Sequence, residues 1–390
     1  MRVIGMISGT SFDGIDVAVA DLELEGGTVA LRPLAETSHP YSPELRAAIA
    51  DALPPRPASA AQVCALDTRI GQAFAAAACS ALDTVDGAAD LVASHGQTLY
   101  HWVDDRRALG TLQLGQPAWI AAETGLPVVA DLRARDIAHG GHGAPLASTL
   151  DVLLLGRDAP RPRAALNLGG IANLTVVGGG IDPIAFDTGP GNALLDVAVA
   201  ELTSGRASFD SGGELAAAGR VDGGLLERLL GDPYYALEPP KSTGKETFHL
   251  PYLRKHLGDR PVDADVLATL VALTAETVAR WCRHYGAADV VASGGGVANP
   301  TLMAALGERL PGVRVRTIDE LGLPAAAKEA YVFALLGFLT VHDLPGAVPS
   351  CTGAREPAIL GAVVPGRHGL PRPERTAATA PSRLRIEGAQ

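Results

Sequence analysis

Short apolar runs alternate with glycine-rich or polar segments along the chain. The runs Arg2 to Ile7 and about Val17 to Leu24 flank the polar loop Ser8 to Asp16, a pattern that predicts a β-hairpin. The pattern recurs where the apolar run Ala164 to Leu168 leads into the glycine-rich loop Gly169 to Asn173 and a return strand. Two such hairpins, about one domain apart, suggest an internal duplication.

Helical patterns and further apolar strands follow one another through the rest of the chain. This alternation predicts an α/β fold with mostly parallel central strands, in which ligands bind where the strands end. The predicted helices cover Ala60 to Leu82, Pro117 to Thr124, Ala193 to Leu202, Asp263 to Tyr285 and Ala325 to Leu339, and additional strands cover Leu91 to Ser94, Val128 to Ala130 and Asp289 to Ala292. From about Arg367 the chain loses periodicity, which predicts a flexible tail over residues 367–390.

Composition narrows the classes of function. Among 390 residues there are 32 Lys and Arg against 43 Asp and Glu, and this net charge of −11 disfavours a broad nucleic-acid surface. The four cysteines are scattered, which argues against a disulfide framework or a zinc site and fits a reducing compartment. The start of the chain lacks a signal-peptide pattern, and the longest apolar stretch, Ala330 to Val341, is too short to cross a bilayer. We therefore expect a cytoplasmic protein with neither a membrane nor a nucleic-acid partner.

The first polar loop has the composition of a phosphate site. Between Gly9 and Asp16, glycine amides can converge on an anion, hydroxyls can donate to phosphate oxygens, and a carboxylate can hold Mg²⁺. An ordinary hairpin turn is the competing interpretation, and for the loop alone it is the favoured one, because Asp13-Gly14 is a strong turn signal. The chain contains no GxxxxGK[ST], so the loop is not a P-loop.

A carboxylate follows the apolar strand that leads into the segment FDTGPGN. Asp187, at the end of that strand, is a candidate general base. The competing interpretation is a helix N-cap, because Ala193 to Leu202 has a helical pattern, but Asn192 serves that function at least as well. We therefore favour Asp187 as a catalytic base.

Three successive glycines, Gly294 to Gly296, lie between a predicted strand and a predicted helix. They let a flat ligand approach the backbone closely, so a nucleoside fits this segment. The dinucleotide-binding fingerprint G-x-G-x-x-G requires a last glycine that this segment lacks, so we do not expect a Rossmann NAD site.

Other polar residues leave more than one interpretation open. Arg133 could bind a carboxylate bidentately or belong to a surface ion-pair cluster. His139 and His142 lack a third ligand at matching spacing, so no metal site is predicted there. The loop around Lys241 could contact phosphate or be an exposed turn, and Glu329 could be a helix-terminal charge or a second active-site carboxylate.

Taken in order, the motifs resemble one family. They read GMISGTSFDGIDVAVADL, SHGQTLYH, TLQLGQPAWIAAETGLPVVADLRARDIAHGGHGAPL, LNLGGIANLT, FDTGPGN, PPKSTGKETF, DVLATLVALTAETVA, SGGGVANPTLM, GLPAAAKEA and PSCTGAREPAILGAVVPG. Over about Met1 to Pro365 the chain resembles the anhydro-N-acetylmuramic acid kinases, of the actin-like ATPase and sugar kinase superfamily. The resemblance implies an ATP-dependent carbohydrate kinase and a homodimer. It implies a two-lobed, ribonuclease H-like α/β fold with an interdomain nucleotide cleft. The N-terminal lobe would contain residues 1–128 and about 350–366, and the C-terminal lobe would contain residues 129–349.

The resemblance also implies functions for individual residues. Asp187 would be the catalytic base, and Asp13 could contact Mg²⁺. Contacts to ATP would come from Gly9, Thr10, Ser11, Phe12, Asp13, Gly14, Ile15, Asp16, Asn167, Gly169, Gly170, Asn173, Gly294, Gly295, Gly296 and Asn299. Contacts to the sugar would come from Gln97, Arg133, Asp136 and Glu329.

The implied chemistry explains why a base is needed. In a 1,6-anhydro sugar, O6 is bonded to C1 and carries no proton, so phosphorylation of O6 requires the C1–O6 bond to break. Asp187 would activate water toward C1 while O6 attacks the γ-phosphate of ATP, giving N-acetylmuramic acid 6-phosphate in peptidoglycan recycling. The alternatives are a conventional kinase acting on a free hydroxyl of another amino sugar, and a non-catalytic ATP-binding sugar sensor or actin-like assembly protein.

Some residues near the implied sugar contacts depart from the family pattern. Leu132 stands where Phe is usual, His142 stands where Gln is usual, and Ala147-Ser148 replaces Val-Pro. These differences leave the fine sugar specificity open.

Overall fold

The computed structural model describes residues 1–105, 107–244, 246–371 and 380–388. The chain forms two compact units: unit 1 contains Met1–Leu154 and Ala327–Gln390, and unit 2 contains Leu155–Ala326. The boundaries therefore differ from those expected at residues 128 and 349. Strand β6 (Val128–Ala130) pairs with β4 of the first sheet, and helix α12 (Lys328–Val341) packs against that sheet, so both belong to unit 1.

Unit 1 is built on a sheet in which the central strands run in the order β6-β4-β1-β2-β3. Strands β12 and β13 extend the two ends of this order, and β5 pairs with β4. The strands are β1 (Arg2–Ser8), β2 (Gly14–Glu25), β3 (Thr28–Pro40), β4 (Leu91–Asp104), β5 (Arg107–Leu114), β6 (Val128–Ala130), β12 (Ala362–Val364) and β13 (Arg383–Ile386). The helices are α1 (Pro43–Ala52), α2 (Ala60–Asp83), α3 (Pro117–Thr124), α4 (Ala134–Ala138), α5 (Ser148–Leu155, at the unit boundary), α12 (Lys328–Val341) and α13 (Pro349–Thr352).

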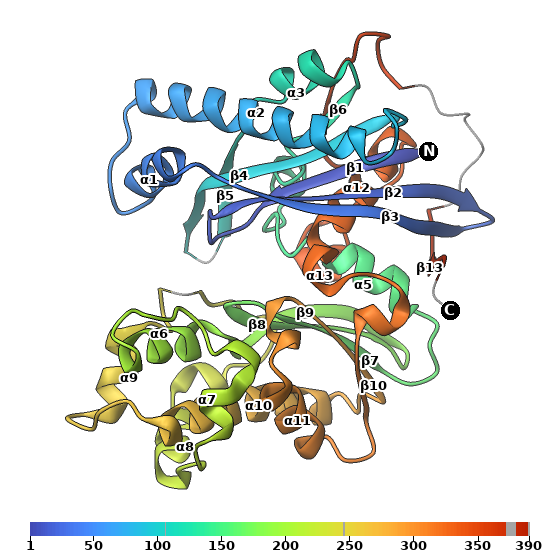
Figure 1. Ribbon diagram of the computed structural model, residues 1–390. Coiled ribbons are helices and arrows are strands. Elements are labelled where there is room, and N and C mark those ends of the chain that lie inside the picture. Colours follow the sequence, from blue (N-terminus) through green and yellow to red (C-terminus); the bar gives the residue numbers. More distant parts are fainter. Residues whose placement is uncertain (106, 245, 372–379, 389–390) are drawn as a thin grey trace. The chain divides into compact units, whose positions relative to one another are not determined.

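Helices cover both faces of the first sheet (Figure 1). Successive side chains of β1 point to opposite faces, so Ile4 and Met6 pack in the core beneath α1 and α2 while Gly5 faces α12. A Cβ atom at Gly5 would lie 2.0 Å from the carbonyl oxygen of Ala330, so only glycine lets α12 approach the strand this closely. The sheet that carries the first glycine loop is therefore held rigidly from both sides.

Unit 2 repeats the central strand order of unit 1. Its sheet runs β11-β10-β7-β8-β9, and each pairing has the same sense as its counterpart in unit 1. The strands are β7 (Arg163–Leu168), β8 (Ile171–Gly178), β9 (Ile181–Pro190), β10 (Asp289–Ser293) and β11 (Arg314–Thr317). The helices are α6 (Ala193–Leu202), α7 (Glu214–Ala217), α8 (Gly223–Leu230), α9 (Leu250–Leu257), α10 (Ala264–His284) and α11 (Pro300–Arg309), with 3₁₀ turns at Ser211–Gly213, Pro233–Ala236, Gly295–Ala298, Ile318–Leu321 and Ala325–Ala327.

Most features of the fold that the sequence predicts are present in the structure. The α/β class, the internal duplication and the ribonuclease H-like strand order of the actin-like fold are confirmed. The prediction of mostly parallel strands is only partly correct. Three neighbouring strands in each sheet are parallel, and β13 is parallel to β3, but the two short hairpin loops at the start of each unit make the pairs that they connect antiparallel.

Several segments have more strand structure than the sequence predicts, and two of them change an earlier prediction. The strand that was predicted to end at Ser94 continues to Asp104, because its second half pairs with β5 in a hairpin. In the tail, predicted to be flexible, Arg383–Ile386 forms β13 and pairs parallel with β3, while residues 372–379 and 389–390 lie outside the described residues.

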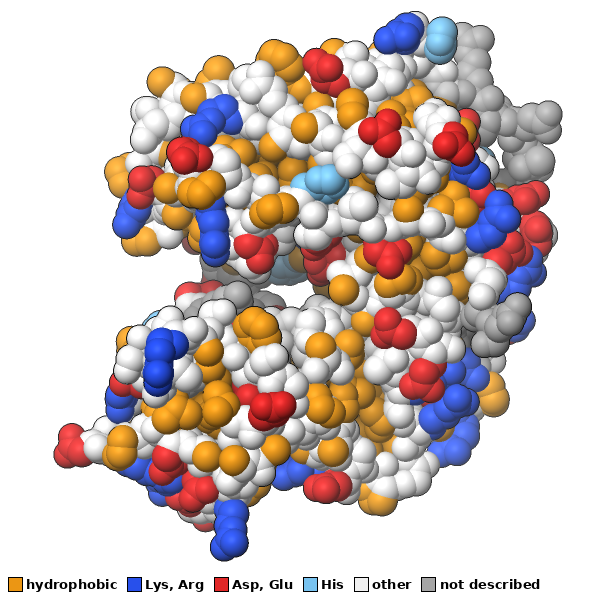
Figure 2. Space-filling model, in the orientation of Figure 1, with side chains coloured by type: hydrophobic (Ala, Val, Ile, Leu, Met, Phe, Trp, Pro, Cys, Tyr) orange, Lys and Arg blue, Asp and Glu red, His pale blue; other side chains and the backbone are white. Residues whose placement is uncertain are grey.

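The face of the molecule drawn in Figure 2 is mixed in charge. On this face, acidic side chains lie among basic ones over much of the surface. None of the helices in the described part of the chain has the length and apolar character needed to cross a membrane.

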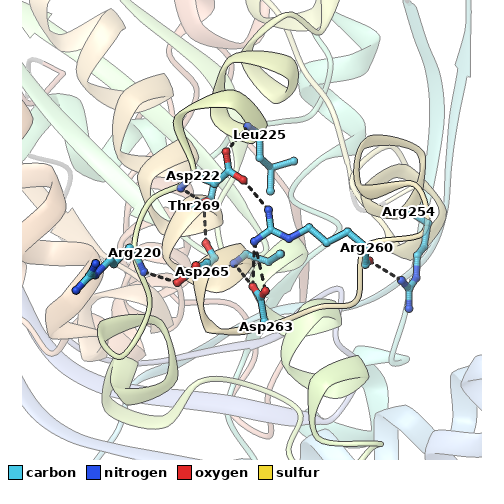
Figure 3. Close-up of polar contacts among 9 residues, drawn as sticks. Arg220, Asp222, Leu225, Arg254, Arg260, Asp263, Asp265 and Thr269 are labelled. Atoms are coloured by element: carbon cyan, nitrogen blue, oxygen red, sulfur yellow. Dashed lines mark hydrogen bonds and ion pairs between the residues drawn. The ribbon is translucent and has the colours of Figure 1, made fainter.

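A polar cluster fixes the helices that support the sheet of unit 2. Asp222 accepts the amide of Leu225 at 2.9 Å at the start of α8, and Asp263 accepts the amide of Val266 at 2.9 Å at the start of α10. The guanidinium of Arg260 lies 2.6 Å from Asp222 and 3.3 Å from Asp263, so it joins the two capping carboxylates (Figure 3). Two helix starts are thereby fastened to one cation.

Replacing Asp263 by Ala should destabilise unit 2. The change removes the cap of α10 and one partner of Arg260, and loss of an N-cap lowers the free energy of unfolding by about 1–2 kcal/mol. Urea unfolding can be followed by the fluorescence of Trp281, the only one of the three tryptophans in unit 2, after Trp102 and Trp119 are replaced by Phe. The control is Asp259→Ala, at an exposed position, which should change stability by less than about 0.5 kcal/mol. Equal effects from both variants would contradict the proposed capping.

Candidate active site

The strand register of unit 2 places four polar residues in one row. Ser293 on β10 pairs with Asn167 on β7, Asn167 pairs with Asn173 on β8, and Asn173 pairs with Asp187 on β9. Paired residues of adjacent strands point to the same face of a sheet, so these side chains are neighbours across the sheet. The sequence placed Asp187 at the end of a strand and Asn173 in a loop. In the structure, Asp187 lies within β9 (Ile181–Pro190) and Asn173 lies in β8.

Three contacts hold Asp187 in place. Its Oδ2 atom accepts the backbone amide of Thr243 at 2.9 Å, and its own amide donates to the carbonyl of Lys241 at 3.0 Å. The hydroxyl of Tyr234 donates to the Asp187 carbonyl at 2.8 Å. The carboxylate is thus oriented by a loop that lies more than fifty residues away in the sequence.

Burial raises the pKa of Asp187 to about 6, although the Thr243 amide works in the opposite direction. The neighbouring charge of Glu246 also raises the pKa, and Lys241 lowers it. A carboxylate with a pKa near 6 is ionised at neutral pH and is a stronger base than an ordinary aspartate. Asp187 therefore has the chemical character of a general base.

The structure excludes the N-cap interpretation of Asp187. Helix α6 begins at Ala193, and Asp187 belongs to the preceding strand. Asn192, the alternative cap, forms no side-chain capping bond either; its Nδ2 atom donates to the carbonyl of Leu168 at 3.3 Å. Asn192 instead connects the helix start to the end of β7.

The second glycine loop is a two-residue turn, Gly169-Gly170, between β7 and β8. The Gly170 carbonyl accepts the amides of Gly191 and Ala193 at 2.9 and 3.0 Å, and the Gly169 carbonyl accepts the amide of Asn192 at 2.9 Å. These bonds fasten the turn to the start of α6, so the loop has one defined conformation.

The glycines after β10 lie beside the same row of residues. Gly294 has a φ of 83°, and a Cβ atom there would lie 2.6 Å from Oδ1 of Asn167. Asn299, predicted to contact the nucleotide, uses its side chain to cap α11, since Oδ1 accepts the amide of Leu302 at 3.0 Å. Gly294 and Asn167 are therefore brought together, whereas the Asn299 side chain has a structural function.

In unit 1, a buried serine supports the first glycine loop. Oγ of Ser8 lies 2.7 Å from the carbonyl oxygen of Gly14 and 2.6 Å from Oε1 of Gln97. Gln97 is buried, and its Nε2 atom donates to the carbonyl of Gly9 at 3.3 Å. Gln97, predicted to contact the sugar, thus supports both ends of the loop.

Residues at the tip of this loop face solvent. Thr10, Ser11 and Asp13 are exposed, and Ser11 donates to Asp13 at 2.7 Å. Phe12 has a φ of 40°, which bends the chain sharply at this point. Ile15 is part of the hydrophobic core, so only its backbone is available to a ligand. The tip offers hydroxyl, carboxylate and backbone groups, as the sequence predicted.

Arg133 is held by a neutral histidine. Its Nε atom donates to Nε2 of His95 at 2.7 Å, while Nη1 donates to the carbonyl of Gly143 at 2.5 Å. Burial and the Arg133 charge keep the pKa of His95 well below its usual value, so the ring accepts this bond as neutral imidazole. Burial also lowers the pKa of Arg133, against the opposing effects of Glu329 and Asp136.

Asp136 and Glu329 lie on different helices and in different surroundings. Asp136 is fully buried, and its carboxylate accepts the amide of Gly143 at 2.7 Å and the hydroxyl of Thr352 at 2.8 Å, so it supports the Gly143 loop. Glu329, in the first turn of α12, keeps an exposed side chain, yet enough protein surrounds it to raise its pKa against the charges of Arg133 and Lys328. Solvent contact leaves the Glu329 carboxylate available to a ligand.

In the described part of the sequence, His, Cys, Asp and Glu do not form a group of three or more that could hold a metal ion. His139 instead lies 3.1 Å from Glu356 as an ion-pair partner.

Three groups that orient predicted residues were not predicted from the sequence: His95 in unit 1, and Tyr234 and the Thr243 amide in unit 2. His95 stands in the quoted motif SHGQTLYH, so its position was visible but its partner was not. Thr243 contributes only a backbone N–H, which no residue type signals.

The sequence is also similar to known proteins over almost its whole length. The family model described as anhydro-N-acetylmuramic acid kinase matches residues 1–366. A Streptomyces coelicolor protein named anhydro-N-acetylmuramic acid kinase is 59% identical over 100% of both chains, and a Rhodococcus erythropolis protein of the same name is 54% identical over 99% of this chain and 100% of its own. Among solved structures, the activator of 2-hydroxyisocaproyl-CoA dehydratase from Clostridium difficile aligns with 87% of this chain and 94% of its own. The identity is 13% and the TM-score is 0.42, so this likeness is distant.

Replacing Gly294 by Ala should lower the stability of unit 2. The residue has a φ of 83°, and the added Cβ would lie 2.6 Å from Asn167 Oδ1 and 2.9 Å from the Leu168 carbonyl oxygen. We expect a loss of about 1–3 kcal/mol in the free energy of unfolding, measured through Trp281 fluorescence in urea. At Gly295 the space is open, so Gly295→Ala should leave the unfolding midpoint almost unchanged. A Gly294→Ala protein as stable as the parent would show that this backbone is not constrained.

Proposed function

Because the chain belongs to the anhydro-N-acetylmuramic acid kinase family, we propose that it converts 1,6-anhydro-N-acetylmuramic acid, ATP and water into N-acetylmuramic acid 6-phosphate and ADP. The reaction opens the anhydro ring and phosphorylates O6, a step of peptidoglycan recycling. The main structural support is Asp187, a half-buried carboxylate whose pKa is raised to about 6 and whose orientation is fixed by the Thr243 amide.

Asp187 accepts a proton from water in this proposal. The water oxygen forms a bond to C1 as the C1–O6 bond breaks, and the electron pair of that bond stays on O6. O6 then bonds to the γ-phosphorus while the bond from phosphorus to the leaving ADP oxygen breaks. The proton on Asp187 passes to solvent, which restores the base and balances the reaction.

The glycine segments are proposed to bind ATP. The exposed tip of the first loop, with Thr10 and Ser11, offers hydroxyl and amide donors suited to phosphate oxygens. The turn Gly169-Gly170 and the segment Gly294 to Gly296 lie beside the row of residues that contains Asp187, and their small size permits a nucleotide to approach the backbone.

The carboxylate of Asp13 fits a supporting contact to Mg²⁺. Asp13 is exposed and is bonded to the Ser11 hydroxyl through one oxygen, so it can reach a metal directly or through water. Bound to ATP, Mg²⁺ would neutralise charge on the phosphates. A single carboxylate contact suits an ion that is held mostly by phosphate and water, and the described residues include no dedicated metal cluster.

We propose different functions for the four residues that were expected to contact the sugar. Arg133 and Glu329 are the stronger candidates, because a guanidinium oriented by His95 and an exposed carboxylate can both reach a polar ligand. Gln97 and Asp136 are proposed to act indirectly, since their polar atoms already support the loops at Gly9 and Gly143.

Two further parts of the proposal concern the protein as a whole. A cytoplasmic location is supported by the need for ATP and by the scattered spacing of the four cysteines along the sequence, which does not suggest a disulfide framework. A homodimer is expected from the resemblance, and analytical ultracentrifugation would determine the oligomeric state.

Labelled water distinguishes this reaction from an ordinary kinase reaction. Incubation with Mg-ATP, 1,6-anhydro-N-acetylmuramic acid and H₂¹⁸O should give a 6-phosphorylated product with one ¹⁸O at C1, detected by mass spectrometry. Asp187→Asn should reduce the rate by about 100- to 10,000-fold, because the base is lost. The matched control is Asp182→Asn, an exposed position on the same strand, which should retain the parent rate. Robust turnover by Asp187→Asn would exclude Asp187 as the base, and turnover of a free-hydroxyl sugar without label would indicate a conventional kinase.

The rate should fall in acid as Asp187 takes up a proton. Because its pKa is raised to about 6, kcat/KM should be constant above roughly pH 7 and should decrease about tenfold per pH unit well below pH 6. Initial rates of ADP release between pH 4.5 and 8, at sugar concentrations below KM, would give this profile. The residual rate of Asp187→Asn should lack the same inflection; an inflection near pH 6 that persists in this variant would assign it to another group.

A further inference from the structure

The loop that holds Asp187 is itself fastened by a buried lysine. We propose that Lys241 is a positioning residue: its ammonium group, enclosed by Tyr234 and Trp281, fixes the loop that delivers the Thr243 amide to the Asp187 carboxylate. The inference rests on the proposed function only in taking Asp187 as the base.

Lys241 does not extend into solvent. Its relative exposure is 8%, and Nζ lies 4.6 Å from the ring centroid of Tyr234 and 4.9 Å from that of Trp281. Nζ also donates to the carbonyl oxygen of Tyr234 at 3.2 Å. Two aromatic faces and one carbonyl therefore bind the cation, an arrangement that stabilises an ammonium group removed from water. Lys241 is thus neither an exposed turn residue nor placed as a phosphate contact.

The same segments that enclose Lys241 also hold Asp187. The Lys241 carbonyl accepts the Asp187 amide at 3.0 Å, and two residues later the Thr243 amide donates to Oδ2 at 2.9 Å. Tyr234, which forms one wall around the ammonium, donates its hydroxyl to the Asp187 carbonyl at 2.8 Å. Any movement of Lys241 therefore displaces the donor of the carboxylate.

Lys241 remains mainly cationic at neutral pH, although its surroundings lower its pKa. Burial and the charge of Arg280 on α10 lower its pKa to about 8, while Glu238 and Asp187 oppose this effect. At neutral pH the ammonium group therefore stays charged between Tyr234 and Trp281, and its charge lowers the pKa of Asp187. A neutral side chain of similar length would lose both the attraction to the rings and this electrostatic effect.

The test follows the Thr243 amide directly by NMR of protein labelled with ¹⁵N-threonine. In the parent protein the amide shift should titrate with a midpoint near pH 6, because the amide is bonded to the ionising carboxylate. In Lys241→Met the amide should exchange with solvent at least tenfold faster, the midpoint should move to higher pH, and kcat should fall at least tenfold while the KM for the sugar changes less than about threefold. Lys241→Arg should restore part of the protection and the rate, because a guanidinium also stacks on aromatic rings.

A matched lysine controls for loss of charge alone. Lys255→Met removes an exposed lysine of α9 in the same unit and should leave the Thr243 amide and kcat unchanged. If Lys241→Met does not fold, Lys241→Gln takes its place, and its faster Thr243 exchange is the expected result.

The outcomes separate this inference from the proposed function. A folded Lys241 variant in which the Thr243 amide keeps its parental exchange rate and midpoint would overturn the positioning function, whatever its activity. If the parent protein does not phosphorylate the anhydro sugar but Lys241→Met still releases the Thr243 amide, the proposed function fails and the positioning of Asp187 stands.

Discussion

The hydrogen bond from the Thr243 amide to the Asp187 carboxylate opposes the effect of burial on the pKa of this carboxylate. Burial in the sheet of unit 2 disfavours the ionised carboxylate and raises its pKa, while the amide favours ionisation and fixes the direction of the lone pairs. With burial alone, the base would be protonated over more of the neutral range; with more hydrogen bonds, it would be a weaker base. The proposed chemistry depends on the position between these limits.

The sheet supplies the rigid part of this arrangement. The register from β10 through β7 and β8 to β9 aligns Ser293, Asn167, Asn173 and Asp187, and Gly294 leaves room for Asn167 beside that row. The duplicated strand order puts a glycine hairpin at the start of each unit. Both hairpins are fastened by contacts from other elements: Gln97 bonds to the first, and the start of α6 bonds to the second.

In each of the two units, polar side chains support other polar groups. His95 orients Arg133, Asp136 holds the Gly143 loop, and Lys241 fastens the loop that reaches Asp187. Such support removes alternative conformations before a ligand binds, so fewer groups have to be ordered when it does. The polar side chains of the sequence motifs are therefore of two kinds. Some, such as Glu329, are exposed, and others are buried and support neighbouring groups.

The sequence by itself determined the α/β class, the extents of helices such as Pro117–Thr124 and the internal duplication, because apolar periodicity and glycine loops are local signals. It also made Asp187 the candidate base, and that assignment remains a prediction. Only the tertiary structure decided that Asn173 pairs with Asp187, that Asp136 supports a loop, and that Lys241 is buried. These features arise from strand pairing and burial between segments distant along the chain. A backbone donor such as the Thr243 amide has no residue-type signature, so its contribution is recognisable only from its position in space.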